Sequence, residues 1–467
     1  MRRLLPATVV LLALAGVTAA CGNGTVGAAT TTSTSGATAE AGSLRGNGSA
    51  VATGAHCGKR EVGLARRLSS GATWRMCLQI DAKRGMVLRE VALTPPGGAV
   101  TTIAHDLSLA QLEVPYDTGA RLTEDITSAG FGGLKMQDLG TKECAGELVT
   151  LPVPTIGDGS QFGEIQHRKV VCSEVTDAGL SYRSSESGKV LAARKDQWTL
   201  STVSKVGWYE YVTRYTFGAD GTISPDLGAT GDLSPVDWTA SAAKGASVGN
   251  GDDEHAASHS HNAVWRVHWA LGKGPLAVEQ YDASPTGKIG KESPLVDGGL
   301  QRLGHATTAD RASRRWWRVV NPGNHNADGH PVSYEIDLGA TDSFELTEDR
   351  LHGAHHGYDV AFTNYDACEV FATGNDETCG DGVPDYVAGD TAPLTDVVSW
   401  IAVGFHHVPR DEDQSPMELH WQGFRLVPRD LTATRFDVPS SRTGRNGQPD
   451  TYEGEPLDEL TDVPGSN

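Results

Sequence analysis

Two histidines one residue apart, His259 and His261, lie in the segment HSHNAVWRVHW, whose apolar and β-branched content is typical of a strand. Side chains at positions i and i+2 of a strand point to the same face of the sheet, so both imidazoles could bind one metal ion. The polar face of a surface strand would show the same spacing. Structural zinc sites use four protein ligands and catalytic sites usually three, so a metal site requires further ligands elsewhere in the chain.

A second histidine pair, His406 and His407, follows the apolar segment VVSWIAVGF. Adjacent residues of a strand face opposite sides, so we expect one imidazole to face the core side, where it needs a polar partner. Three imidazoles with an open coordination position suit copper or zinc. The remaining histidine clusters lie in glycine-rich turn sequence, and we interpret their members as loop residues: His325, His330, His352, His355 and His356.

The elements that would position these histidines are short. Between residues 56 and 430, segments of strand length such as MVLREVAL, RKVVCSEV and AVWRVHWAL alternate with Gly, Pro, Asn and Asp, and amphipathic helices are scarce. This pattern predicts an all-β fold, a large β-sandwich that forms one domain. Residues 431–467 are polar and rich in Pro, Gly and acidic residues, which is typical of a surface or disordered tail.

The N-terminal segment has the composition of an export signal. Residues 1–20 combine two arginines, an apolar run and small residues, as in a secretory signal peptide, and the run is short for a membrane-spanning helix. Cys21 follows directly, as in a bacterial lipoprotein, although Thr18 also fits ordinary secretion. Residues 21–55 are mostly Thr, Ser, Gly and Ala and predict a disordered tether. We therefore expect an extracellular or cell-surface protein that contacts the membrane only through a lipid on Cys21.

Cysteine number and net charge agree with export. Of seven cysteines, Cys21 would carry the lipid, and the six others predict disulfides in an exported chain. Six cysteines allow fifteen pairings. Sequence proximity favours the one that joins Cys57–Cys77, Cys144–Cys172 and Cys368–Cys379. The formal charge of −20 argues against a nucleic-acid partner and is compatible with small cations such as amines, although an acidic surface also simply favours solubility.

The order of the motifs resembles the catalytic domain of the topaquinone-containing copper amine oxidases. A Tyr-acid-Tyr strand in GWYEYVTRYTFGADGTI, the HxH strand and the segment GFHHVPRDED follow one another as in that family. The resemblance implies that Tyr209 is the precursor of topaquinone. It also implies that His259, His261 and His407 hold the copper ion, and that His406 does not.

The resemblance extends from about residue 57 to residue 430. In VPYDTGARLTEDITSAGFG, Asp125 matches the catalytic aspartate, with Gly130 and Gly132 at the family's spacing. Tyr116 matches the tyrosine that hydrogen-bonds the quinone. The segments ECAGEL and KVVCSE match the family's disulfide, which supports the pairing of Cys144 with Cys172.

Several positions depart from the family's pattern. Trp208 replaces an asparagine before the cofactor tyrosine, and Lys205 replaces a threonine or serine. The segment TNYDA looks like the cofactor motif, but it follows the HxH strand, so we reject Tyr365 as the precursor. Where many members carry acidic ligands of a peripheral calcium ion, this chain has His268 and Ala270 and keeps only Asp396, so no such site is expected.

The resemblance implies a primary-amine oxidase that uses copper and topaquinone. Such an enzyme converts a small primary amine, O2 and water to an aldehyde, NH3 and H2O2, with Asp125 as general base, and its members form homodimers. The alternative is a copper-binding or structural cell-surface β-sandwich protein with impaired catalysis, because the cofactor motif is altered at two positions.

Overall fold

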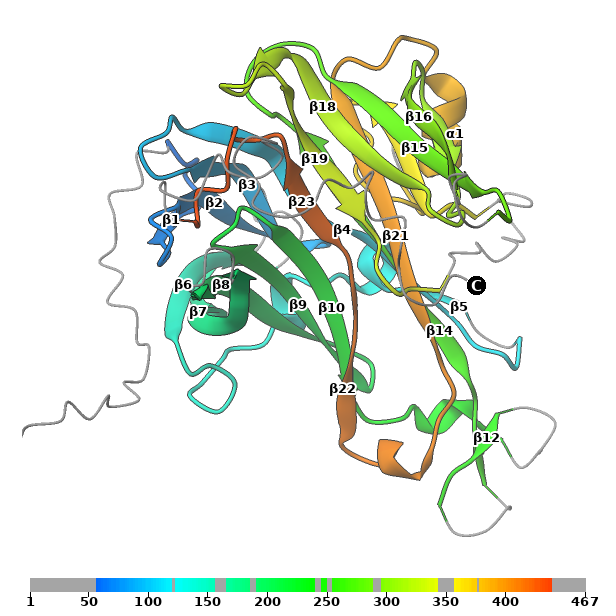
Figure 1. The fold of residues 1–467 in the computed structure, drawn as a ribbon. Helices are drawn as coiled ribbons and strands as arrows, with labels where there is room; N and C mark the ends of the chain where they lie inside the picture. The colour runs from blue at the N-terminus through cyan, green and yellow to red at the C-terminus, as the bar shows by residue number, and fades with distance from the viewer. Residues whose placement is uncertain are drawn as a thin grey trace, which may run out of the picture. The chain divides into compact units, whose positions relative to one another are not determined.

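The computed structural model describes residues 56–119, 122–155, 165–184, 190–239, 245–249, 254–288, 295–342, 357–375 and 378–438. These residues form two large antiparallel β-sheets and one small one (Figure 1), which confirms the predicted all-β class. Within them α1 (Val383–Gly389) is the only α-helix, and short helical turns span Asp125–Ala129, Gly133–Lys135, Pro235–Asp237 and Asp411–Asp413. No helix of this part of the chain is long and apolar enough to cross a membrane.

The first sheet places β14 (His259–Trp269) between β4 (Thr101–Pro115) and β21 (Val397–His407). In the described residues its strand order is β1-β2-β3-β4-β14-β21-β20-β17, with β5 paired to β4. The other strands are β1 (Val62–Arg67), β2 (Thr73–Asp81), β3 (Gly85–Thr94), β5 (Leu122–Glu124), β17 (Thr307–Ala309) and β20 (Val360–Asn364). Both predicted histidine pairs thus lie on neighbouring central strands.

The second sheet has the order β16-β15-β18-β19-β23-β10-β9-β8-β7-β6 within the same residues, with β22 paired to β10. Its strands are β6 (Glu147–Pro154), β7 (Ile165–Ser184), β8 (Leu191–Val206), β9 (Tyr209–Gly218), β10 (Ile223–Gly231), β15 (Ala277–Pro285), β16 (Leu295–Leu303), β18 (Trp316–His325), β19 (Pro331–Asp337), β22 (Met417–Gly423) and β23 (Arg425–Arg429). The small sheet contains β11 (Trp238–Thr239), β12 (Ala246–Ser247) and β13 (His255–Ala256).

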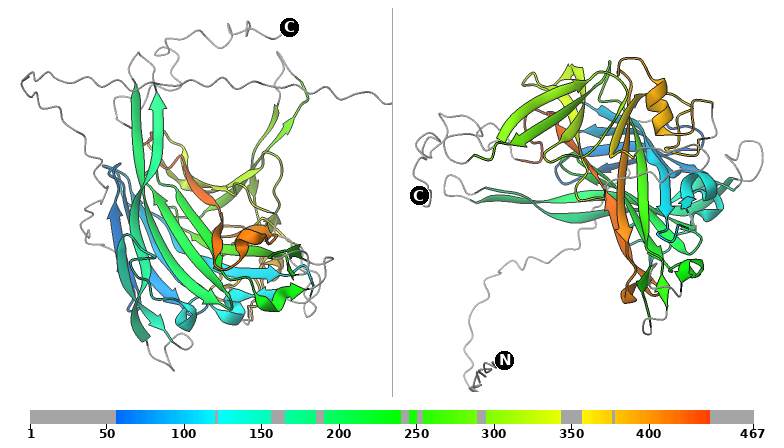
Figure 2. Two further views of the ribbon diagram at one scale, coloured as in Figure 1. Left: turned by 90° about the horizontal axis from the view of Figure 1, so that it is seen from below. Right: turned by 90° about the vertical axis from the view of Figure 1, so that its right-hand side faces the viewer.

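Large aromatic side chains fill the space between the two main sheets. Figure 2 shows the blue strands β1–β3 beside the cyan and green strands of the second sheet. The Trp74 ring of β2 lies 5.1 Å from Phe217 of β9, and Trp265 of β14 lies 5.4 Å from Tyr215 of β9. Strand β9 alternates buried and half-buried residues along most of its length, so every second side chain enters this core. The face-to-face packing of the sheets confirms the predicted sandwich.

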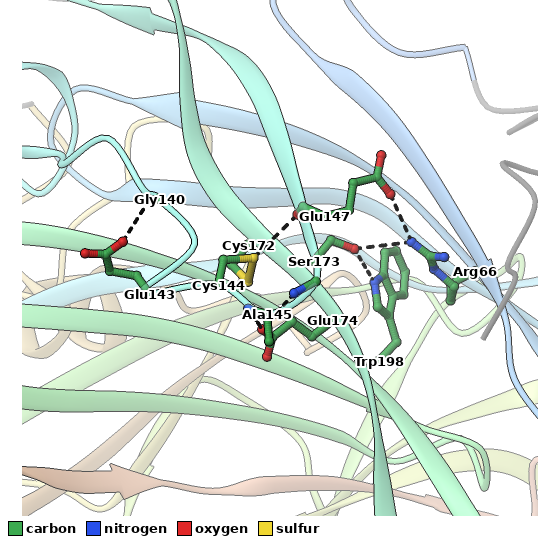
Figure 3. Close-up of a disulfide and its surroundings, with 11 residues drawn as sticks. Arg66, Gly140, Glu143, Cys144, Ala145, Glu147, Cys172, Ser173, Glu174 and Trp198 are labelled. Carbon is green, nitrogen blue, oxygen red and sulfur yellow. Dashed lines mark hydrogen bonds and ion pairs between the residues drawn. A yellow bond between two sulfur atoms is a disulfide. The ribbon is translucent and has the colours of Figure 1, made fainter. Parts of the chain in front are cut away.

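All three predicted disulfide pairings are present: Cys57–Cys77, Cys144–Cys172 and Cys368–Cys379. Figure 3 shows Cys144–Cys172, which ties the segment before β6 to β7. The Glu174 carboxylate next to it accepts hydrogen bonds from the backbone N–H groups of Ala145 and Gly146, at 2.6 and 3.1 Å. A covalent loop of this size stabilises the fold by about 3 kcal/mol, chiefly by restricting the unfolded chain.

The proposed signal and tether, residues 1–55, lie outside the described residues, as does the tail beyond residue 438. At the start of the predicted tail, Leu431 and Phe436 pack against the hydrophobic core. This stretch therefore belongs to the folded body.

Candidate metal centre and active site

Strand pairing brings three histidines together. In the antiparallel ladder of β14 and β21, His259 lies directly opposite His407. His261 is two residues along β14 and shares the face of His259. One ring nitrogen of each histidine lies within 4.8 Å of the others, and all three side chains are buried. His406 points the other way, is exposed, and places Nε2 3.0 Å from the Asp117 carboxylate.

The hydrogen bonds of these rings determine which nitrogens face one another. Nδ1 of His259 bonds to the carbonyl oxygen of Ala257 at 3.1 Å, and Nε2 of His407 bonds to the Asp413 carboxylate at 3.0 Å. As a result Nε2 of His259 faces Nδ1 of His407 at 3.3 Å. Neither ring nitrogen of buried His261 has a hydrogen-bond partner among the described residues. Three imidazole nitrogens converge, and within the described residues the His261 ring makes no hydrogen bond of its own. This donor set fits copper.

The electrostatics of the cluster favour neutral imidazoles. Burial lowers the pKa of His261 well below its ordinary value, and His259 and His407 lower it further. Burial also lowers the pKa of His407, although its hydrogen bond to Asp413 opposes this effect. A neutral imidazole is the form that binds a metal ion, so these histidines are in the form that coordination requires.

Asp413 is a site residue that the sequence did not reveal. It is fully buried, and its Oδ2 also accepts a hydrogen bond from the backbone N–H of Arg410 at 3.0 Å. The helical turn Asp411–Asp413 folds it back onto His407, so that the carboxylate orients the ring through Nε2, while Nδ1 faces His259. The only sign of this role in the sequence is that Asp413 stands six positions after His407.

Tyr209 lies at the edge of this cluster. It is the first residue of β9, which a two-residue loop joins to β8, and Gly207 in that loop has a φ of +61°, which suits the first position of a tight hairpin turn. The Tyr209 side chain is buried, and its hydroxyl oxygen lies 3.0 Å from Nε2 of His259. Its ring centroid is 5.5 Å from that of His261. The phenol is thus held against the candidate metal ligands.

Asp125 begins a five-residue π-helical turn, Asp125–Ala129, that closes when the N–H of Gly130 donates to the Asp125 carbonyl at 2.8 Å. This turn is pressed against the β2–β3 connection. A Cβ atom on Gly130, whose φ is +79°, would lie 2.6 Å from the carbonyl oxygen of Ala82. A Cβ on Gly132 would lie 2.0 Å from the carbonyl oxygen of Asp81. The two glycines therefore permit a contact that no other residue allows.

Tyr211 links Asp125 to Tyr209, and no motif in the sequence marks it as a site residue. Burial raises the pKa of Tyr211 well above its ordinary value, and the charge of Asp125 and the hydrogen bond to it add to this rise. The Tyr211 ring stacks on Tyr209 at 6.0 Å and on Phe131 at 5.1 Å. Strand periodicity could have identified it, because residues 209 and 211 of one strand share a face.

Tyr116 directly follows β4 and forms an isolated bridge with His259. Its buried ring stacks on the His259 ring, with centroids 4.9 Å apart and planes inclined by 29°. Tyr116 and Tyr209 both contact His259, and Asp125 is hydrogen-bonded to Tyr211, whose ring stacks on Tyr209. The structure thus brings the expected site residues together. They come from the end of β4, the π turn, β9, β14 and β21.

The residues that depart from the family's pattern lie at the margin of this cluster. Trp208 occupies the β8–β9 loop with 39% of its surface exposed. Lys205 pairs with Glu210 at 3.5 Å on the outer face of the sheet, opposite to Tyr209. Neither substitution places a side chain between Tyr209 and the histidines.

Tyr365 and His268 form a separate cluster near the other end of β14. Their rings stack at 4.2 Å, and Nε2 of His268 bonds to the Asp396 carboxylate at 2.8 Å. Tyr365 is therefore not at the three-histidine cluster. Of the histidines expected in loops, His325 instead ends β18 and His330 precedes β19, whereas residues 352–356 lie outside the described residues.

The sequence profile of "Copper amine oxidase, enzyme domain" matches residues 67–443. The chain belongs to the copper amine oxidase family. It is 26% identical over 422 residues to the histamine oxidase of Arthrobacter globiformis, covering 81% of this chain and 58% of that protein. It is 25% identical over 402 residues to primary amine oxidase 2 of Arabidopsis thaliana, covering 81% and 59%.

Solved structures of family members share the fold. The copper-containing benzylamine oxidase of Hansenula polymorpha superimposes with a TM-score of 0.65 at 22% identity, over 78% of this chain and 60% of that one. The amine oxidase of Aspergillus nidulans gives a TM-score of 0.64 at 18% identity, over 83% and 57%. The chain thus spans about three-fifths of the length of these relatives.

Proposed function

We propose that this protein is a primary-amine oxidase that uses copper and a topaquinone derived from Tyr209. The reaction converts an amine RCH2NH2, O2 and H2O to an aldehyde RCHO, NH3 and H2O2. Copper and the quinone would supply an electron-accepting carbonyl, which ordinary side chains lack. The observation that carries the proposal is the 3.0 Å approach of the Tyr209 hydroxyl to Nε2 of His259, because it sets the ring to be modified beside three converging imidazoles.

The protein's own residues would perform the acid–base chemistry. Asp125, 6% exposed, would be the general base that accepts the proton from the carbon that bears the amine. The hydroxyl of Tyr211 donates a hydrogen bond to Asp125 and would hold its carboxylate in one orientation. Tyr116 stacks on the His259 ring and would hold the quinone ring derived from Tyr209 from that side.

The proposal includes a location outside the cytoplasm, with a lipid on Cys21 as the membrane anchor, and a homodimer as in the family. Three disulfides support the location, because such bonds persist in oxidising compartments and are rare in the cytosol. The proposed substrate is a small primary amine rather than a nucleic acid, as the formal charge of −20 favours cations.

The test is to load the purified protein with copper in the presence of O2, and then to measure copper content, quinone redox staining and H2O2 release with simple primary amines. The proposal expects one copper ion per chain, a positive stain that is lost in Tyr209→Phe, and amine-dependent peroxide. Copper without stain or peroxide would instead identify a copper-binding protein with impaired catalysis.

A further inference from the structure

We propose that Gln111 is a positioning residue that holds the Asp125 turn in its working orientation; this inference rests on the proposed function. Gln111 lies on β4, is fully buried, and makes hydrogen bonds through both ends of its side-chain amide. Two of these bonds go to the residues that directly follow Asp125.

The amide oxygen of Gln111 accepts a hydrogen bond from the backbone N–H of Ile126 at 3.2 Å and from that of Leu112 at 3.0 Å. Its amide nitrogen donates to Oγ1 of Thr127 at 2.9 Å and to the carbonyl oxygen of Thr373 at 2.9 Å. One side chain thus joins β4, the π turn and the segment before α1. A buried amide that uses both donors and its acceptor is strongly oriented, because any rotation leaves buried polar groups unpaired.

An irregularity in β4 makes these contacts available. Opposite Val264 and Trp265 of β14, strand β4 places Gln111 and Leu109, so Ala110 is an extra residue that forms a β-bulge. Before the bulge, Leu107 and Leu109 face the core between the sheets, and after it Leu112 and Val114 do. In an unbroken strand residue 111 would share the core face of residues 107 and 109. The bulge therefore turns the amide out of the apolar core and toward the Asp125 turn.

The segment before α1 also contacts the turn closely, through the backbone of Gly374 and the side chain of Thr127. Gly374 has a φ of +65°, and a Cβ atom there would lie 2.8 Å from Oγ1 of Thr127, the hydroxyl that Gln111 also binds. Thr373, which supplies the accepting carbonyl, donates its own hydroxyl to buried Glu113 of β4 at 3.0 Å. The turn is thus fixed between β4 and this segment, and Gln111 is the side chain that bonds to both.

The position of the Asp125 carboxylate is expected to control the catalytic rate. A displacement of about 1 Å at a catalytic group can cost about 100-fold in rate, even when the altered residue lies outside the chemistry. Without the bonds to Ile126 and Thr127 the π turn can shift, and the Asp125 carboxylate shifts with it. Because Gln111 acts through Asp125, its loss should lower kcat and leave amine binding nearly unchanged.

The test compares Gln111→Met with Gln422→Met, which removes a buried amide of the same size on β22. In Gln111→Met we expect normal copper and quinone content, a kcat lower by about 100-fold, a KM within about 2-fold, and a larger deuterium isotope effect with an α-deuterated amine. Amide exchange of the peptide containing Ile126 should accelerate about 10-fold in the metal-free protein, since that N–H loses its acceptor. Gln422→Met should change none of these quantities.

Thr127→Val provides a second variant that removes only the hydroxyl bound by Gln111, and it decides the matter if Gln111→Met does not fold. A kcat within 2-fold of wild type in both folded variants would overturn the positioning role while the wild type still releases peroxide. If Gln111→Met does not fold, a kcat within 2-fold of wild type in Thr127→Val overturns it in the same way. A copper-loaded wild type with neither quinone nor peroxide would overturn the proposed function and this role together.

Discussion

The hydroxyl oxygen of Tyr209 lies 3.0 Å from Nε2 of His259, and that same nitrogen lies 3.3 Å from Nδ1 of His407. The phenol oxygen therefore lies beside two of the imidazole nitrogens that would hold a metal ion. In the proposed enzyme, modification of the Tyr209 ring would therefore depend on the metal bound beside it.

Replacing a histidine of the cluster should remove the metal. We expect His259→Ala, His261→Ala and His407→Ala each to lose stoichiometric copper and the quinone, because two imidazoles are too few ligands. His406→Ala is the matched control, since the His406 ring is exposed and points away from the three-histidine cluster. Metal analysis of the four proteins checks this, and a copper loss in His406→Ala larger than in His407→Ala would refute the ligand assignment.

Asp125→Asn should separate cofactor formation from turnover. The amide keeps an oxygen that can accept the Tyr211 hydrogen bond but cannot take up a proton, so we expect normal copper and quinone with kcat lower by about 10²–10⁴-fold. Asp117→Asn, which alters an exposed carboxylate on His406, should retain activity. Measurements of peroxide release compare the turnover of Asp125→Asn with that of Asp117→Asn. Near-normal turnover in Asp125→Asn would exclude Asp125 as the base.

Asp413→Asn should weaken copper binding without unfolding the protein. The carboxylate fixes the His407 ring through a 3.0 Å hydrogen bond, and the loss of such a partner typically costs about 10–100-fold in metal affinity. Asp411→Asn changes an exposed carboxylate two residues earlier and serves as control. Competition titration with a chelator gives both affinities, and equal values would show that Asp413 does not orient the ligand.

Glu369 predicts a pH dependence of stability. Burial raises its pKa from 4.5 to about 7, and the nearby charge of Asp366 adds to the rise. Between these two pH values the folded state holds a proton that the unfolded state has released, so the free energy of unfolding falls as pH increases. The total loss is about 3 kcal/mol.

Glu369→Gln removes this titration. It should therefore be about 3 kcal/mol more stable than wild type at pH 8, relative to their difference at pH 4. Urea unfolding at the two pH values measures the change. A stability difference that does not vary with pH would show that the pKa of Glu369 is the same in the folded and unfolded states.

Local rules predicted the strands, the facing of the histidines and the disulfides. Period-two alternation assigns His259 and His261 to one face and separates His406 from His407, and this depends on neighbouring residues only. The contact between His259 and His407 was beyond such rules, because β14 and β21 pair across 148 residues. The roles of Asp413 and Gln111 depend on a helical turn and a β-bulge, whose positions follow from tertiary packing rather than from composition.

The ladder between β14 and β21 also sets an order of assembly. A chain synthesised only as far as β14 carries two of the imidazoles and lacks the third, so an early ion meets an incomplete set of ligands and binds weakly. Closing a loop of this length is slow compared with forming local hairpins. In the proposed site, tight copper binding would begin only when β21 has docked beside β14, and the rate of copper incorporation into refolding protein would report the completion of the first sheet.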